Sequence, residues 1–303
     1  MDIPPEVINA LQASTASDLY PVTGSESYDS AILKTGILQF DSGAILRLTR
    51  LDVPFLIICA RQILLRGPAP HATITRDMGI VAKTGAFGAN GVRGTDGARA
   101  GMGGAHAAGG SAGMPGQSDA LPPLYIFMEE MVAHPQAPSE WLDFWLLMPG
   151  IGGGAGGVGG SGGDGGVGAA GTPGKDGLLA CEVRPGDGGN GGAGGPGSAG
   201  GAGGNGSDGG QLVYVGPDTA RAQMSWIKVV NIGGAGGQGG ARGRGGAGGH
   251  GGSPGTNTAY CPPGRNGFAG PNGIDGVDGP SGQPGKKGIV SLVVRVSLDD
   301  LYA

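Results

Sequence analysis

The sequence predicts a mainly β protein with almost no α-helix, in which a solenoid-like or sandwich-like base of short strands carries a bundle of glycine-rich helices. Two observations predict this fold class. Glycine makes up 72 of the 303 residues, against a usual share of about 7%, and it stands at every third position throughout 150–177, 188–209, 234–255 and 264–288. Between these blocks lie short apolar runs, rich in Val, Ile and Leu and bounded by turn residues, which are typical of strands.

The period of three indicates the helix type. A left-handed helix of the polyproline II type has three residues per turn, a rise of about 3.1 Å and no internal hydrogen bonds. Its amides must find partners on neighbouring helices, and a line of glycines lets two such backbones come close enough to pair. We therefore expect a polyglycine II bundle of about six such left-handed helices.

Two alternatives to this bundle remain open. Residues 264–288 have the Gly-X-Y form of collagen, with Pro271, Pro280 and Pro284, although the Gly-Gly-X runs lack the proline that stiffens a collagen triple helix. Disorder is the second alternative, since a chain rich in Gly and Pro without a period is typically unfolded.

The composition shifts divide the chain into an N-terminal segment, a β base and three arms. The N-terminal segment is 1–30; we expect one short helix within 5–19, and a contact that reaches into the next subunit. The β base is expected at 31–78, 121–149, 211–232 and 289–303, and the polyglycine II arms at 79–120, 150–210 and 233–288.

Each arm is expected to leave the base, turn at a tip and return. The tips are expected at 98–107, 178–187 and 257–263, which gives the second and third arms passes of roughly 70–85 Å. In 150–167, 188–210 and 234–252 the unit is mostly Gly-Gly-X with small X, so two bare faces are available for neighbours. The bulkier Gly-X-Y unit of 264–288 leaves one bare face, which predicts a pass at the edge of the bundle.

The cysteines Cys181 and Cys261 fall at the tips of the second and third arms, at the same distance from the base. A disulfide between them would join the two tips, provided that their Cα atoms lie within about 7 Å and that the surroundings are oxidising. The alternative is two free thiols in neighbouring loops. Cys59 lies in an apolar run and reads as a buried, inert thiol.

No constellation of residues predicts catalysis. The four histidines are scattered and have no partners at metal-ligand spacing, so we expect no metal and no cofactor. The net charge of −5 gives no electrostatic footprint for nucleic acid, and no apolar run approaches the ~20 residues of a membrane-spanning helix. We therefore expect no enzyme activity, no nucleic-acid partner and no membrane insertion.

Two sets of residues are candidates for contacts. Trp141, Phe144 and Trp145 belong to the densest aromatic run and are candidates for an assembly interface; the alternative is the core of the β base. At the expected arm tips, the candidates for contacts with a partner are Glu182, Arg184 and Tyr260.

The Gly-Gly-X blocks resemble polyglycine II helix-bundle proteins, namely the tip adhesins of some phage long tail fibres and a small glycine-rich antifreeze protein. The resemblance is one of architecture and covers roughly 79–288. Likeness to the adhesins implies tip loops that touch a receptor on a cell surface, and likeness to the antifreeze protein implies ice binding.

The sequence leads to one main hypothesis of function and two alternatives. We expect a structural protein that forms a homo-oligomer or polymer through its β base, in an extracellular filament or surface layer. We see no signal peptide at the N-terminus, so we expect synthesis in the cytoplasm and arrival outside the cell or on a virion by another route. The alternatives are a receptor-binding adhesin and an ice-binding protein.

Overall fold

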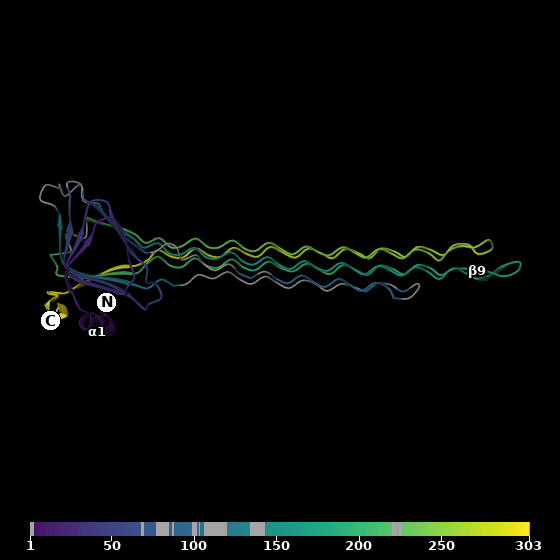
Figure 1. Cartoon of the computed structure of the whole chain (residues 1–303), viewed down its shortest axis with the longest axis horizontal. Helices are drawn as coiled ribbons and strands as arrows, with labels where there is room; N and C mark the ends of the chain where they lie inside the picture. The colour runs from purple at the N-terminus through teal and green to yellow at the C-terminus, as the bar shows by residue number, and fades with distance from the viewer. Residues whose placement is uncertain are drawn as a thin grey trace.

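The computed structural model describes residues 3–67, 70–76, 85–86, 88–98, 102, 104–105, 120–133, 143–219, 223 and 226–302. Two parts are plain in Figure 1: a base of strands that also holds both ends of the chain, and long extended segments that project together from one side of it. The protein is mainly β, its base is built from parallel sheets, and it has almost no α-helix.

The strands of the base alternate between two sheets along the chain. Within the described residues, sheet A has six strands and sheet B has five, all paired parallel and stacked in chain order. Sheet A holds β1 (Ser17–Val22), β3 (Ile32–Phe40), β5 (Leu56–Leu65), β7 (Leu124–Ala133), β11 (Leu212–Gly216) and β13 (Val290–Val294). Sheet B holds β2 (Ser25–Tyr28), β4 (Ala44–Leu48), β6 (His71–Arg76), β8 (Asp143–Leu147) and β12 (Ile227–Val230). We call one strand of sheet A and the following strand of sheet B a rung.

The main core lies between the two sheets. Inward residues align from rung to rung, as in the row of Leu33, Ile58, Ile126, Tyr214 and Leu292 on sheet A. Because neighbouring rungs place similar apolar side chains one above another, each rung buries the face of the next. Burying apolar surface in this way contributes about 25 cal/mol per Å².

A second apolar cluster covers the outer face of sheet A. The helices α1 (Pro5–Ala13) and α3 (Asp299–Tyr302) contact each other there. Val7 and Leu11 of α1 and Leu301 of α3 are fully buried against Phe127 and neighbouring residues of the sheet. The Lys34 ammonium donates to the Leu11 (3.0 Å) and Ser14 (2.8 Å) carbonyls, so it satisfies carbonyls at the end of α1.

The prediction that residues 1–30 stand apart from the base is wrong for 17–28. Residues 17–28 form β1 and β2, the first rung of the stack, and Val22 is fully buried. Tyr20 and Tyr28 pack edge to face (5.7 Å between ring centroids) at that end of the core. The strands were missed because Pro21 interrupts one and the other is polar, so neither shows an apolar run.

Arms two and three leave the base after β8 and β12 and return to β11 and β13. Their outgoing passes, 150–174 and 233–255, run parallel to each other, with bonds from Gly150 N to the Ile232 carbonyl (2.8 Å) through Gly174 N to the Thr256 carbonyl (3.0 Å). Their returning passes, 186–210 and 264–288, also pair in parallel. The outgoing passes therefore continue the strand pairing of sheet B, and the returning passes continue that of sheet A.

Hydrogen bonds also join the two layers of passes. Gly189, Gly192 and Gly195 of the second arm's returning pass donate to carbonyls of its outgoing pass, each at 2.8 Å. In the first arm, Gly85 N donates to the Ala155 carbonyl (2.8 Å) and Gly97 N to the Val167 carbonyl (2.8 Å) of the outgoing layer, and Gly104 N donates to the Asn190 carbonyl (2.8 Å) of the returning layer. Most of the tip predicted for this arm, 98–107, lies outside the described residues. Each pass is thus held by amides that donate to its neighbours at every third residue.

The glycine positions are those where neighbouring backbones come closest. A Cβ on Gly153 would lie 1.8 Å from the Gly204 carbonyl oxygen, and one on Gly165 would lie 1.9 Å from that of Gly192. Positions that face solvent tolerate large side chains: Phe268, Ile274 and Val277 lie exposed on 264–288, which forms an edge of the bundle.

Side chains of Asp and Asn pair with backbone amides of neighbouring passes. Between the two returning passes, four such acceptors face amides 78 residues further along the chain. The pairs are Asp187 with Arg265 N, Asn190 with Phe268 N, Asn205 with Gln283 N and Asp208 with Lys286 N, at 2.7–2.9 Å. These bonds use backbone amides of non-glycine residues, which take no part in the hydrogen bonds made by every third glycine.

Candidate functional sites at the arm tip and the stack ends

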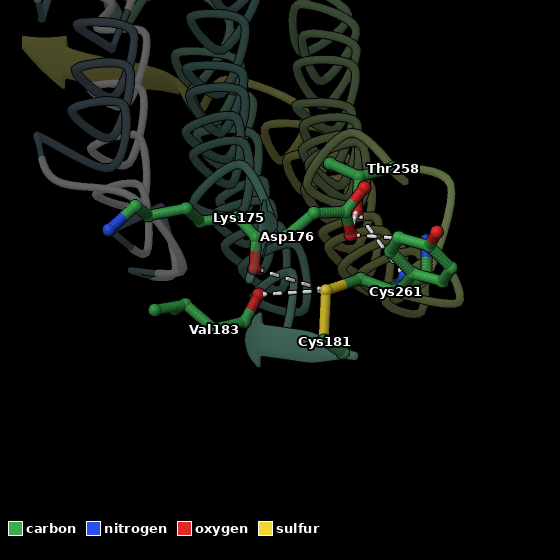
Figure 2. The surroundings of a disulfide bond; sticks show 7 residues. Lys175, Asp176, Cys181, Val183, Thr258 and Cys261 are labelled. Carbon is green, nitrogen blue, oxygen red and sulfur yellow. Dashed lines mark hydrogen bonds between the residues drawn. A yellow bond between two sulfur atoms is a disulfide. The ribbon is translucent and has the colours of Figure 1, made fainter. Parts of the chain in front are cut away.

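The second arm reverses direction in a small hairpin of β9 (Lys175–Asp176) and β10 (Cys181–Val183). The turn is closed by a bond from Gly177 N to the Ala180 carbonyl (2.8 Å). Cys181 is bonded to Cys261 of the third arm, with the two Cα atoms 4.8 Å apart. Figure 2 shows this disulfide at the far end of the arms, where it joins two tips that are 80 residues apart in sequence.

The Asp176 carboxylate organises the neighbouring tip loop. Its Oδ1 accepts hydrogen bonds from the Thr258 hydroxyl and from Tyr260 N (3.1 Å), and the Thr258 Oγ1 accepts one from Cys261 N (3.3 Å). Figure 2 shows Asp176 and Thr258 side by side next to Cys261. The tip of the third arm is therefore fixed to the second arm by polar contacts as well as by the disulfide.

The residues predicted for tip contacts, Glu182, Arg184 and Tyr260, are all exposed at this end. Glu182 forms an ion pair with Lys175 (3.0 Å). The sequence reasoning missed Leu178 and Leu179, which are 94% and 84% exposed in the hairpin turn. Their position could have been suspected, because two leucines directly follow the last glycine of an unbroken run.

The predicted aromatic interface does not form as a group. Phe144 points into the core, where it is fully buried and packs edge to face on Phe40 (5.7 Å), so the prediction that it contacts another subunit is wrong. Trp145 points to the other face of sheet B, where it is half-buried and the Lys228 ammonium lies 5.0 Å from its ring centroid. Trp141 lies outside the described residues. Alternation along a strand sends successive side chains to opposite faces, which separates Phe144 from Trp145.

An ionic cluster lies on the outer face of sheet B. Asp143 accepts a hydrogen bond from the Lys228 ammonium and contacts His71 Nδ1 (2.9 Å). These residues come from β8, β12 and β6, three neighbouring strands. The bond from Lys228, with smaller contributions from Trp145 and His71, lowers the pKa of Asp143 to about 2. The cluster thus links three neighbouring strands of sheet B on its outer face.

The two ends of sheet A differ in how their edges are protected. The edge strand β1 contains Pro21, which has no N–H to offer another strand. The edge strand β13 reads Val-Ser-Leu-Val-Val and contains neither Pro nor a charge, and Val290 and Val294 are 43% and 55% exposed. Natural proteins usually protect such edges with Pro, Lys or a covering segment. Among the described residues, no strand pairs with the outer edge of β13.

The residues that the structure describes contain no group of three or more His, Cys, Asp or Glu side chains placed to hold a metal ion. Among the helices of that part of the chain, none is long and apolar enough to cross a bilayer.

The buried thiol of Cys59 donates to the Tyr302 hydroxyl (3.6 Å), and burial raises the pKa of this thiol to about 11.

No family model matches the sequence, and no curated protein matches it significantly. Among solved structures, it matches an antifreeze protein of the springtail Granisotoma rainieri, described as a bundle of nine polyproline type II helices. The two sequences are 27% identical over 63% of this chain and 94% of that chain, with a TM-score of 0.09. Backbones with so low a TM-score do not superpose, so this likeness carries no argument about fold or function.

Proposed function

We propose that this chain is a non-enzymatic structural protein that self-assembles through its β base into an extracellular filament or surface layer. The base is a β-solenoid, and rigid polyglycine II arms project from it. The observation that carries the proposal is the unprotected edge of β13 at one end of a parallel stack.

An open parallel stack favours head-to-tail addition. The backbone N–H and C=O groups on the free edge of a strand are a template for another strand. Because all strands of the base run parallel and stack in chain order, the two ends of the stack differ, and contact between unlike ends is heterologous. Such contacts generate open filaments whenever the rotation between copies does not close a ring.

The polyglycine II assignment of the arms is supported by the contacts between passes. Amides at every third residue donate to neighbouring passes over the whole of the second and third arms. A three-fold helix without internal hydrogen bonds needs this pattern. Bonds in several directions around each pass make the arms stiff, which suits a role as rigid projections.

Electron microscopy of the purified full-length protein at micromolar concentration tests the proposal. We expect filaments or sheets with a regular axial repeat and with projections on their surface. Monodisperse particles under all conditions of salt and concentration would contradict self-assembly.

A receptor-binding adhesin is the second candidate, favoured by the exposed Leu178 and Leu179 in a hairpin held by the disulfide. In that case, monomeric protein binds cells, and the variant L178D/L179D loses this binding. If the wild type and L178D/L179D both form filaments and neither binds cells, the result argues for the structural role.

A further inference from the structure

We infer that β13 of one copy pairs with β3 of the next copy, so that β13 and the next copy's β1 lie end to end in a single rung. The inference rests on the proposed self-assembly and specifies its partner, a second copy of this chain, and the strands that meet. It predicts that the stack repeats every five rungs.

β1 covers β3 only from Thr35 to Phe40, and leaves the first three residues of β3 without a partner on that side. The pairing of β1 with β3 begins at Ser17 and Thr35 and ends at Val22 and Phe40. Ile32, Leu33 and Lys34 of β3 pair with β5 on one side, and among the described residues no strand pairs with their other side. The first three residues of β3 therefore present a free edge at the beginning of the stack.

Residues of β13 fall in the rows that β1 leaves uncovered. Val293 aligns with Val215, which aligns with Phe127, then with Cys59 and finally with Lys34. The same tracing places Leu292 in the row of Leu33, and Ser291 in the row of Ile32. Ser291, Leu292 and Val293 thus occupy the three rows in which β3 is unpaired. Val294 falls in the row of Thr35, where β1 begins with Ser17, so the two strands meet at that row and must diverge there.

The free backbone groups of β13 and β3 also point in matching directions. The Ile289 carbonyl and the Arg295 amide bond to β11, so the alternation of a parallel ladder turns the groups of Leu292 outward. On β3 the Ala31 carbonyl bonds to β5, so the groups of Ile32 and Lys34 turn outward. With Leu292 opposite Leu33 of the next copy, the Leu292 N–H faces the Ile32 carbonyl, and its carbonyl faces the Lys34 N–H.

With a shared rung, sheet B continues without a gap from one copy to the next. Sheet B has five strands in the described residues and sheet A has six. If β13 and the next β1 share one rung, β12 lies directly beside the next copy's β2. If they occupied separate rungs, one strand position in sheet B would stay empty and leave a cavity in the core, which is destabilising.

The two arrangements predict different axial repeats. Neighbouring strands lie about 4.8 Å apart, so five rungs give a repeat of about 24 Å and six rungs give about 29 Å. Cryo-electron microscopy or fibre diffraction of wild-type filaments distinguishes these values. A repeat near 29 Å would overturn the shared rung while leaving the proposed self-assembly intact.

Cysteine cross-linking tests the strand register. Ser291 and Ile32 stand in one row, so the pair S291C/I32C should form disulfides between copies and give a ladder of multimers on non-reducing gels. Within one copy these positions are separated by the intervening strands of sheet A, which prevents an internal bond. The matched control S291C/Q39C moves one cysteine seven residues along β3, roughly 23 Å away, and should give no ladder.

A substitution on the edge strand tests the junction independently. Val294 ends β13 and Val296 lies two residues beyond it, and both side chains are exposed. We expect V294K to raise the concentration needed for assembly at least tenfold, because Lys on an edge strand blocks pairing, and V296K to leave it nearly unchanged. Both variants should keep the wild-type circular dichroism spectrum.

The outcomes separate the two proposals. Filaments with a 24 Å repeat, an S291C/I32C ladder and a V294K defect support the shared rung. Filaments without the ladder, or with equal effects of V294K and V296K, overturn it and leave self-assembly standing. Absence of any polymer in the wild type overturns both.

Discussion

At the scale of single residues, the absence of a Cβ at defined glycines makes close packing of the arms possible. A Cβ on Gly159 would lie 2.4 Å from the Ser198 carbonyl oxygen and 2.6 Å from that of Ala199. Gly152 is different, because its nearest neighbour, the Ala235 carbonyl oxygen, would lie 3.6 Å from an added Cβ. Close packing against a neighbouring backbone therefore requires glycine at position 159 and does not require it at position 152.

This difference gives a matched pair of variants. Replacing Gly159 by Ala, or more severely by Val, should lower the free energy of unfolding by at least about 2 kcal/mol, because backbone must move. G152A should be neutral or stabilising by about 0.5 kcal/mol, since Ala restricts the unfolded chain. Thermal melting curves and hydrogen exchange rates over 150–210 measure the effects of both substitutions. Equal melting temperatures for G159V and the wild type would contradict the packed arrangement.

Asp143 provides a residue-scale prediction about pH. Its pKa in the folded protein is lowered to about 2, against about 3.9 in an unfolded chain. The stabilisation is therefore fully present above about pH 5 and disappears as the pH falls toward 2. D143N should cost less than about 1 kcal/mol at pH 7, because the cluster is partly exposed. In urea titrations the charge-dependent part of the stability difference between wild type and D143N should be lost as the pH falls through about 2; a difference that does not change with pH would refute the assignment.

At the scale of elements, the hairpin of β9 and β10 and the disulfide close the far end of the arms. The disulfide joins residues 80 apart, and cross-links of this kind typically contribute about 2–4 kcal/mol. The hydrogen bonds between passes hold the arms along their length without it. Loss of the disulfide should therefore destabilise the tips of the arms before the ends that adjoin the base.

The double variant C181S/C261S tests this order. We expect a fall of about 2–4 kcal/mol in unfolding free energy and faster hydrogen exchange at 175–183 and 257–263. Exchange near 150–160 and 200–210 should stay as in the wild type. Reduction of the wild type with dithiothreitol should reproduce the variant, and uniform loss of protection over whole arms would contradict the distributed bonding.

At the scale of the whole molecule, the two layers of arms continue the two sheets of the base. The β8–β12 pair leads directly into the pairing of Gly150 with Ile232, and the returning pair that ends at Gly209 and Lys286 leads into β11 and β13. The order of the rungs thereby sets the order of the passes. Any assembly of the bases consequently sets the spacing of the arms.

The proposed assembly predicts a stabilising change at one end of the stack. Glu26 stands in the inward row of Leu46, Ile74, Leu146 and Val229, and its carboxylate accepts a hydrogen bond from Thr23 N (3.0 Å). Stacking of β12 on the next copy's β2 would cover this charge, which is costly. E26Q keeps the hydrogen-bond acceptor and should lower the critical concentration several-fold in pelleting assays. A higher critical concentration for E26Q would argue against this junction.

Much of the architecture could be predicted from the sequence because period and composition act locally. Glycine in phase at 150–177 and 264–288 indicates extended passes, and the strands at 56–65, 124–133 and 212–216 show as apolar runs. The first rung could not be found in this way. Tyr20 and Tyr28 become part of the core only because β3 and β4 lie beside them.

The candidate sites likewise divide into those that local sequence predicts and those that depend on neighbouring segments. The equal spacing of Cys181 and Cys261 along their arms suggested that they meet, since each pass advances by a constant rise. The inward direction of Phe144, the exposure of Leu178 and the free edge of β13 depend on which segments lie next to them.

The sequence by itself therefore determined the extended passes, the tips of the second and third arms and the presence of a β base, because local backbone preference follows from residue type and period. Only the tertiary structure decided the parallel pairing, the two continuous layers of passes and the unequal ends of sheet A. Those features depend on contacts between segments tens of residues apart, and a periodic sequence is compatible with many such pairings until the stacked core selects one.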